Sequence, residues 1–305
     1  MTEEKIDRIK AYEEKKAYEE KKDIKLSQKK TPTFLLPNAL TILGVCLGLS
    51  SIKFALDSNY TIAVIAIGFA AILDTLDGRV ARLIKGTSKV GKELDSLTDV
   101  ISFGVAPSFI MYFWAINEIG KFGWLLVLVY TVCCALRLAR FNLTKINENE
   151  SWKINFFEGV PSPAAAGLVL LPLILSLSNI VEILNLNEVI KMFNLVYIFQ
   201  IGNNSIFGSI VILITSILMV SKVPTYSLKR IAIPRSLGAF LLLGIGVYIS
   251  VLIFFTFEVL FLTGLIYIFL IPISYFHHKY LNKKFLKERV LQGENFEEDE
   301  IEDIL

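Results

Sequence analysis

Long apolar runs constrain this chain more than any other feature of its sequence. Each run approaches the roughly 20 residues that an α-helix needs to cross the hydrocarbon core of a bilayer. The apolar residues come in unbroken stretches, whereas a membrane β-barrel would show short alternating segments. The chain is 54% hydrophobic, more than an ordinary soluble domain. The sequence therefore predicts an all-α, polytopic integral membrane protein.

We expect eight membrane-spanning helices. They are predicted near residues 39–56, 60–84, 95–117, 122–138, 161–178, 204–220, 236–255 and 257–276. Lys and Arg concentrate in the N-terminal segment, in alternate loops and beyond residue 279. Because loops rich in Lys and Arg stay on the cytoplasmic side, we expect both termini and these loops to face the cytoplasm. The charged first thirty residues also lack the apolar stretch of a cleavable signal peptide.

The cysteines and the net charge give no sign of a disulfide, a zinc site or a charged partner. Cys46, Cys133 and Cys134 fall inside apolar runs without metal-site spacing, so we expect small buried apolar residues rather than disulfides or zinc ligands. The formal net charge of +2 is a balance of charged tails and basic loops, and we expect no nucleic-acid partner.

Four aspartates at the second and third predicted spans carry the chemistry. Asp74 and Asp77 are three residues apart, and Asp95 and Asp99 are four apart, so each pair lies on one face of its helix. The short loop between the spans predicts that both pairs meet at one site near the cytoplasmic boundary. Carboxylates in apolar helices are costly. For any one aspartate the alternative is a salt bridge with a nearby Arg or Lys. Salt bridges alone would explain neither the neighbouring glycines nor the confinement of all four acids to the facing sides of two helices.

A divalent metal is the simplest way to neutralise such a cluster, because like charges at close range repel. The ligands are all oxygen, which favours Mg²⁺, Mn²⁺ or Ca²⁺ over zinc. Two ions would suit phosphoryl transfer. Gly78 and Gly91, one turn from Asp74 and Asp95, would let a phosphate approach the backbone, and Arg82 is suited to a pyrophosphate oxygen.

This pattern resembles the motif of the CDP-alcohol phosphotransferase family, D-x-x-D-G-x-x-A-R-x8-G-x-x-x-D-x-x-x-D. Every position is filled, by Asp74, Asp77, Gly78, Ala81, Arg82, Gly91, Asp95 and Asp99. The resemblance implies that Asp74, Asp77 and Asp95 bind two ions, Mg²⁺ or Mn²⁺, with Ca²⁺ less active. It further implies that Gly78, Ala81, Arg82 and Gly91 border the cytidine nucleotide, and that Asp99 is both close to the metals and the base for the acceptor hydroxyl. Asn38 and Thr41, just before the first span, are similar to the family's polar residues near the nucleotide, although a simple helix start explains them equally well.

Three polar islands at the cytoplasmic face bear on the acceptor alcohol. They contain Arg137, Arg140 and Asn142, then Ser162 in a Pro-Ser-Pro sequence, then Lys222, Thr225 and Tyr226. They resemble segments of the integral-membrane (type II) phosphatidylserine synthases of bacteria and archaea, over roughly residues 35–230. The resemblance implies transfer of a phosphatidyl group from CDP-diacylglycerol to L-serine with release of CMP. Arg137 and Arg140 would bind the serine carboxylate or a lipid phosphate, or else only anchor the cytoplasmic side.

Two alternatives stay open at this point. Another acceptor, such as glycerol 3-phosphate, an inositol phosphate or choline, would use the same chemistry. A cation transporter also carries intramembrane acids, but would have them near mid-membrane in both halves of a repeat.

We expect a charged segment at 1–34, a catalytic membrane core at 35–230, an additional hairpin at 231–278 and a charged tail at 279–305. The resemblance also implies a homodimer among membrane lipids, and the Gly44-x-x-x-Gly48 sequence predicts close helix packing.

Overall fold

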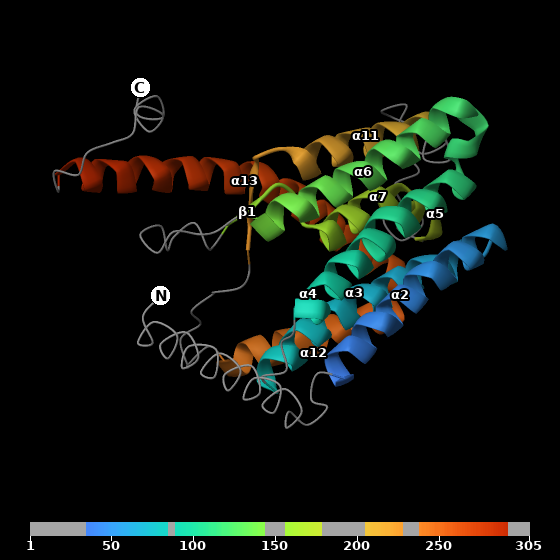
Figure 1. Cartoon of the computed structure of the whole chain (residues 1–305), viewed down its shortest axis with the longest axis horizontal. Helices are drawn as coiled ribbons and strands as arrows, with labels where there is room; N and C mark the ends of the chain where they lie inside the picture. The colour runs from blue at the N-terminus through green and yellow to red at the C-terminus, as the bar shows by residue number, and fades with distance from the viewer. Residues whose placement is uncertain (1–34, 85–88, 144–155, 179–204, 228–237, 292–305) are drawn as a thin grey trace, which may run out of the picture.

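Helices dominate the computed structural model, which describes residues 35–84, 89–143, 156–178, 205–227 and 238–291 (Figure 1). In chain order the helices are α2 (Leu35–Leu56), α3 (Tyr60–Leu83), α4 (Lys89–Asp99), the π-helix η1 (Val100–Val105), α5 (Ala106–Trp114), the 3₁₀-helix η2 (Ile116–Ile119), α6 (Lys121–Leu143), α7 (Ser162–Leu177), α11 (Ser205–Val220), α12 (Gly238–Phe254) and α13 (Thr256–Leu291). Because α4, η1 and α5 follow one another without a break, they form one rod. The described residues thus hold a long helical rod at each of the eight predicted spans.

Five of these rods are long and apolar enough to cross a membrane. They are Leu36–Leu56, Tyr60–Leu83, Val90–Trp114, Lys121–Leu143 and Thr256–Phe285. The helices Ser162–Leu177, Ser205–Val220 and Phe240–Phe254 are apolar but shorter. The prediction of a helical membrane protein is confirmed, whereas eight crossings stay a prediction.

Helix ends depart from the sequence-based bounds in several places, among them the end of α6 at Leu143 instead of 138. The first helix begins at Leu35, so Asn38 and Thr41 lie inside it rather than before it. Pro37 is tolerated there because first-turn amides have no helical acceptor. The third rod begins at Lys89 instead of 95, and α13 continues to Leu291 instead of ending at 276. Polar residues that the apolar pattern left out thus extend the helices.

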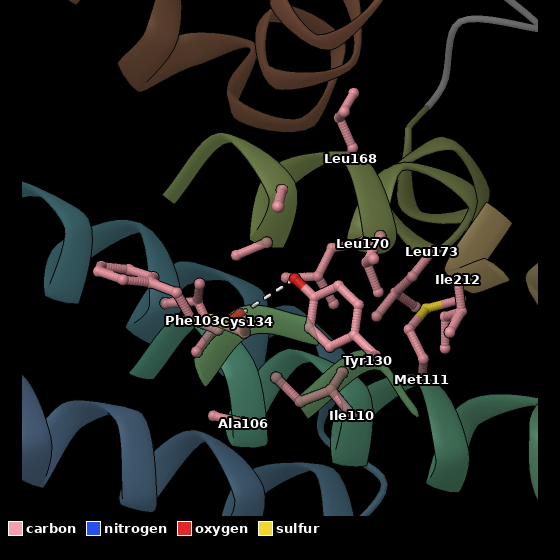
Figure 2. Packing of buried hydrophobic residues seen from close by; sticks show 14 of the residues in the cluster. Phe103, Ala106, Ile110, Met111, Tyr130, Cys134, Leu168, Leu170, Leu173 and Ile212 are labelled. Atoms are coloured by element: carbon pink, nitrogen blue, oxygen red, sulfur yellow. Dashed lines mark hydrogen bonds between the residues drawn. The ribbon is translucent and has the colours of Figure 1, made fainter. Parts of the chain in front are cut away.

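The core lies between η1, α5, α6 and α7 (Figure 2). The Tyr130 hydroxyl on α6 donates a hydrogen bond to the Phe103 carbonyl of η1 at 3.0 Å, and both residues are fully buried. A buried phenol needs such a partner. Cys134 is buried beside them as predicted. Cys133 is half-buried and Cys46 is exposed, which corrects the expectation for these two cysteines. All three cysteines are free thiols.

Helix α2 packs closely on the rod that carries two of the aspartates. A Cβ at Gly48 would lie 2.6 Å from Ser102 Oγ, closer than real contacts allow. The Ser102 hydroxyl donates to the Gly44 carbonyl at 3.2 Å. The close packing predicted from the two glycines is confirmed, and it occurs within the chain.

One feature that the sequence did not predict is a short β-ribbon. Strand β1 (Phe156–Glu158) pairs antiparallel with β2 (Pro224–Tyr226), and Phe157 lies opposite Thr225. The turn after β1 needs Gly159, whose φ is +71° and whose added Cβ would lie 2.6 Å from the Met219 carbonyl oxygen. The Thr225 hydroxyl donates to the Gly159 carbonyl at 2.8 Å. The ribbon brings the second and third polar islands together.

Helices α12 and α13 are the last pair in the chain. Nearly all described side chains of α12 are exposed although the helix is apolar, as expected of a surface that faces lipid. The C-terminal part of α13 projects beyond the bundle (Figure 1). Its inner face contacts α7 and the ribbon, where Tyr226 Oη and His277 Nδ1 lie 2.8 Å apart.

Candidate active site

Three aspartates converge where α3 ends and α4 leads into η1. Asp74, Asp95 and Asp99 each offer a carboxylate oxygen, and these oxygens lie within 4.8 Å of one another. All three side chains are partly buried. The helical spacing of Asp95 and Asp99 turns both toward α3, as predicted. This is the arrangement of oxygen ligands that a hard divalent cation prefers.

The fourth aspartate of the motif, Asp77, stands beside this cluster. Its carboxylate is within electrostatic range of Asp74 and Asp95, but it is outside the group of three. Asp77 is only 4% exposed, and its Oδ2 accepts a hydrogen bond from Thr41 Oγ1 at 2.6 Å. Thr41 therefore connects the start of α2 to the motif, a partnership that the sequence did not specify. The role of Asp77 as a metal ligand stays a prediction.

The predicted nucleotide-binding residues Gly78, Ala81 and Arg82 lie near the end of α3. Gly78 is exposed, and a Cβ there would meet nothing within 4 Å. Arg82 is exposed and its Nε donates to the Gly78 carbonyl at 3.0 Å. Ala81 and Gly91 are partly buried, the latter in the first turn of α4, and Asn38 lies one turn before Thr41 on α2. The open space over Gly78 agrees with the close approach of a ligand.

A second set of polar contacts joins the first two islands to the aspartates. The buried Arg137 on α6 donates from Nη1 to Ser162 Oγ at 2.9 Å. Ser162, the first residue of α7, donates in turn to Asp99 Oδ2 at 3.5 Å. Arg137 and Asp99 are also within electrostatic range of each other. Two predicted acceptor residues thus meet the predicted base.

Two polar atoms in this set have no hydrogen-bond partner in the described parts of the chain. They are Asp99 Oδ1 and Arg137 Nε, both buried. A buried polar group without a partner is costly, and such groups mark sites where an ion, water or ligand belongs. The free oxygen of Asp99 fits a metal ion or a donated proton, and the free N–H of Arg137 fits an anion.

The other predicted acceptor residues have different contacts. Asn142 Nδ2 donates to Ser96 Oγ at 2.9 Å, which ties the end of α6 to α4. Arg140 is exposed and donates from Nη1 to the Val220 carbonyl at 2.8 Å. The Thr225 hydroxyl bonds to the Gly159 carbonyl next to the ribbon, and Tyr226 contacts His277 of α13. Lys222 is exposed. For these residues the described contacts are structural, and acceptor binding stays a prediction.

Sequence reasoning missed one residue near this set, Tyr267 on α13. It is within electrostatic range of Arg137. A single tyrosine in an apolar span has no motif or spacing that would reveal it. Only the packing of α13 against the earlier helices brings it here.

Comparisons with known proteins agree on one family. The family model described as CDP-alcohol phosphatidyltransferase matches residues 34–200. A CDP-diacylglycerol–serine O-phosphatidyltransferase of Mycobacterium leprae is 32% identical over 250 residues, which are 81% of this chain and 76% of that protein. Proteins of the same name are 44% identical over 135 residues in Mycobacterium tuberculosis and 45% identical over 144 residues in Helicobacter pylori. The matched parts span 46% and 59% of the lengths of those two relatives.

Proposed function

Because the chain belongs to the CDP-alcohol phosphatidyltransferase family, we propose that it transfers the phosphatidyl group of CDP-diacylglycerol to L-serine, forming phosphatidylserine and CMP. The observation that carries the proposal is the set of three clustered aspartates inside the matched region. The choice of serine rests on the relatives named as serine O-phosphatidyltransferases.

The residues fit a divalent metal centre. Asp74, Asp95 and Asp99 would hold Mg²⁺ or Mn²⁺, with Asp77 beside them for a second ion. Three carboxylates at this distance are stable together only if their charge is neutralised, and the unpartnered Asp99 Oδ1 fits a ligand atom. When bound, the ions would stabilise negative charge on the transferred phosphoryl group.

The chain's own residues account for the movement of the proton and the orientation of the acceptor. The serine hydroxyl oxygen forms the new bond to the phosphorus that carries diacylglycerol, and the bond from that phosphorus to the CMP oxygen breaks. Asp99 accepts the hydroxyl proton as general base. Ser162 donates a hydrogen bond to Asp99 Oδ2, and Arg137 donates one to Ser162. These two bonds keep the base in one orientation. Gly78, Ala81, Arg82 and Gly91 would border the nucleotide, with Asn38 and Thr41 nearby.

The proposed setting is the cytoplasmic membrane, with the active site and both termini on the cytoplasmic side. The acyl chains of the donor would stay in the bilayer while the nucleotide enters from the cytoplasm. In this arrangement the three shorter helices also cross the membrane, residues 35–230 form the catalytic core, and 231–278 add a hairpin. The charged segments 1–34 and 279–305 lie in the cytoplasm, and the protein is a homodimer. The basic residues of alternate loops support this orientation.

A headgroup assay tests the proposal. Purified protein is given CDP-diacylglycerol, Mg²⁺ or Mn²⁺, and one alcohol at a time: serine, glycerol 3-phosphate, inositol phosphate or choline. We expect CMP release far above background with serine alone. A preference for another alcohol would overturn serine as acceptor and leave the transferase chemistry in force. No CMP with any alcohol would overturn both.

A further inference from the structure

Helix α13 lies outside the region that matches the family model, yet one of its faces packs against α7 and the ribbon. Gly264, Tyr267, Ile271 and Ser274 follow one another at helical spacing and share this face. The two helices approach closely at Gly264, where an added Cβ would displace Leu171 Cδ1 of α7. The same helix is held to β2 by the contact between Tyr226 and His277.

The Tyr267 hydroxyl is buried in this contact. It lies beside Thr225 and within electrostatic range of the Arg137 guanidinium. The Thr225 hydroxyl donates its proton to the Gly159 carbonyl at 2.8 Å. Thr225 is close enough to interact with the Tyr267 hydroxyl, but no described group meets the hydrogen-bond geometry at the Tyr267 oxygen. A polar group buried in this way is costly unless a ligand or water completes it.

The three unpartnered atoms belong to side chains linked through Arg137, which is within electrostatic range of both Tyr267 and Asp99. Arg137 Nε is an N–H donor, the Tyr267 hydroxyl is a donor as well, and Asp99 Oδ1 is an acceptor. A guanidinium N–H together with a nearby hydroxyl donor fits an anionic group such as a carboxylate. A carboxylate oxygen at Asp99 fits a hydroxyl proton. A hydroxy amino acid carries both of these groups in one small molecule.

We infer that Tyr267 is a specificity-determining residue for the acceptor, whose carboxylate it binds together with Arg137 while Asp99 receives the acceptor's hydroxyl. This inference rests on the proposed function and adds to it. A helix beyond the matched family region completes the acceptor site, and the contact selects acceptors that carry a carboxylate next to the reacting alcohol.

The test compares serine with ethanolamine, which keeps the hydroxyl and the amine but lacks the carboxylate. Steady-state CMP release is measured for the wild-type protein and for Tyr267→Phe, which keeps the ring that packs on the core and removes only the oxygen. The matched control is Tyr275→Phe, on the same helix but exposed. We expect Tyr267→Phe to raise the KM for serine about tenfold or more, the effect of losing a hydrogen bond to a charged group. Its kcat/KM for ethanolamine and its KM for CDP-diacylglycerol should stay unchanged.

The outcomes separate this inference from the proposed function. A wild-type protein that is active with serine, combined with an unchanged serine KM in Tyr267→Phe, overturns the role of Tyr267 alone. An equal loss with serine and ethanolamine also overturns it, because a structural defect would not distinguish the two acceptors. A wild-type protein that makes no CMP with serine overturns the proposed acceptor and this inference together.

Discussion

The three clustered aspartates come from two helices that follow each other directly in the chain, whereas the polar residues around Arg137 come from segments spread over most of it. Asp74, Asp95 and Asp99 lie within 25 residues of sequence. Arg137, Ser162, Thr225 and Tyr267 lie on α6, α7, β2 and α13. The first region is a local structure that a motif can encode, and the second depends on how distant helices pack. We expect the chemistry common to the family to depend on the first region, and we propose that acceptor choice depends on the second.

Metal removal should give the largest effect and acts on the local region alone. Exhaustive chelation should abolish CMP release, and Mg²⁺ or Mn²⁺ should restore it while Zn²⁺ does not, because the ligands are all oxygen. The measurement is CMP release before and after adding back each ion. Full turnover after chelation would contradict the metal centre.

Asp99 is the point where the two regions meet, and Asp99→Asn tests its role. The amide keeps the shape but cannot take a proton, so turnover should fall by about 10²–10⁴-fold while CDP-diacylglycerol still binds in the presence of metal. Donor binding and CMP release are measured on the same purified variant.

Two further variants give this experiment its controls. Asp77→Asn should weaken metal binding as well as turnover. Asp57→Asn removes an exposed carboxylate that pairs only with Lys53 among the described contacts, and it should change neither quantity. If Asp99→Asn loses donor and metal binding as fully as Asp77→Asn, Asp99 is chiefly a ligand and another group accepts the proton.

Substitutions at Arg137 and Arg140 test whether these arginines bind the acceptor or only anchor the cytoplasmic side of the protein. Arg137→Lys keeps the charge but loses the guanidinium that reaches Ser162, and kcat/KM for serine should fall about 10- to 100-fold, within the range for hydrogen bonds to charged groups. Arg140→Lys, on an exposed side chain, should change kcat/KM by less than about threefold. A change of less than about threefold in both variants would contradict the role of Arg137 in acceptor binding.

The smallest effect concerns the turn that joins the islands. Gly159→Ala forces a Cβ onto a backbone with φ of +71° and toward the Met219 carbonyl, which should destabilise the fold by about 1–3 kcal/mol. The thermal midpoint in detergent should fall by several degrees. Gly167→Ala is the control, since a Cβ there meets nothing within 4 Å, and alanine favours a helix. Equal midpoints for both variants would mean that the ribbon contributes little to stability.

Much of the fold follows from patterns that need no tertiary information. Unbroken apolar runs predicted every helical rod in the described residues, because a helix in lipid must satisfy its own backbone. The predicted helix ends were less accurate. Polar residues, such as Lys89 at the start of α4 and the charged residues before Leu291 in α13, continue a helix without an apolar signal. The β-ribbon was missed because two three-residue strands are too short to show an alternating pattern.

The sequence by itself determined the cluster of Asp74, Asp95 and Asp99, although it also placed Asp77 in the same group. Helical spacing fixes which side chains share a face, and a short loop keeps two helices together, so both constraints are local. Only the tertiary structure decided that Thr41 holds Asp77, that Ser162 connects Arg137 to Asp99, and that Tyr267 lies near them. These contacts join residues far apart in the chain. They depend on glycines and side-chain shapes at helix interfaces, whose effect appears only when the helices are packed.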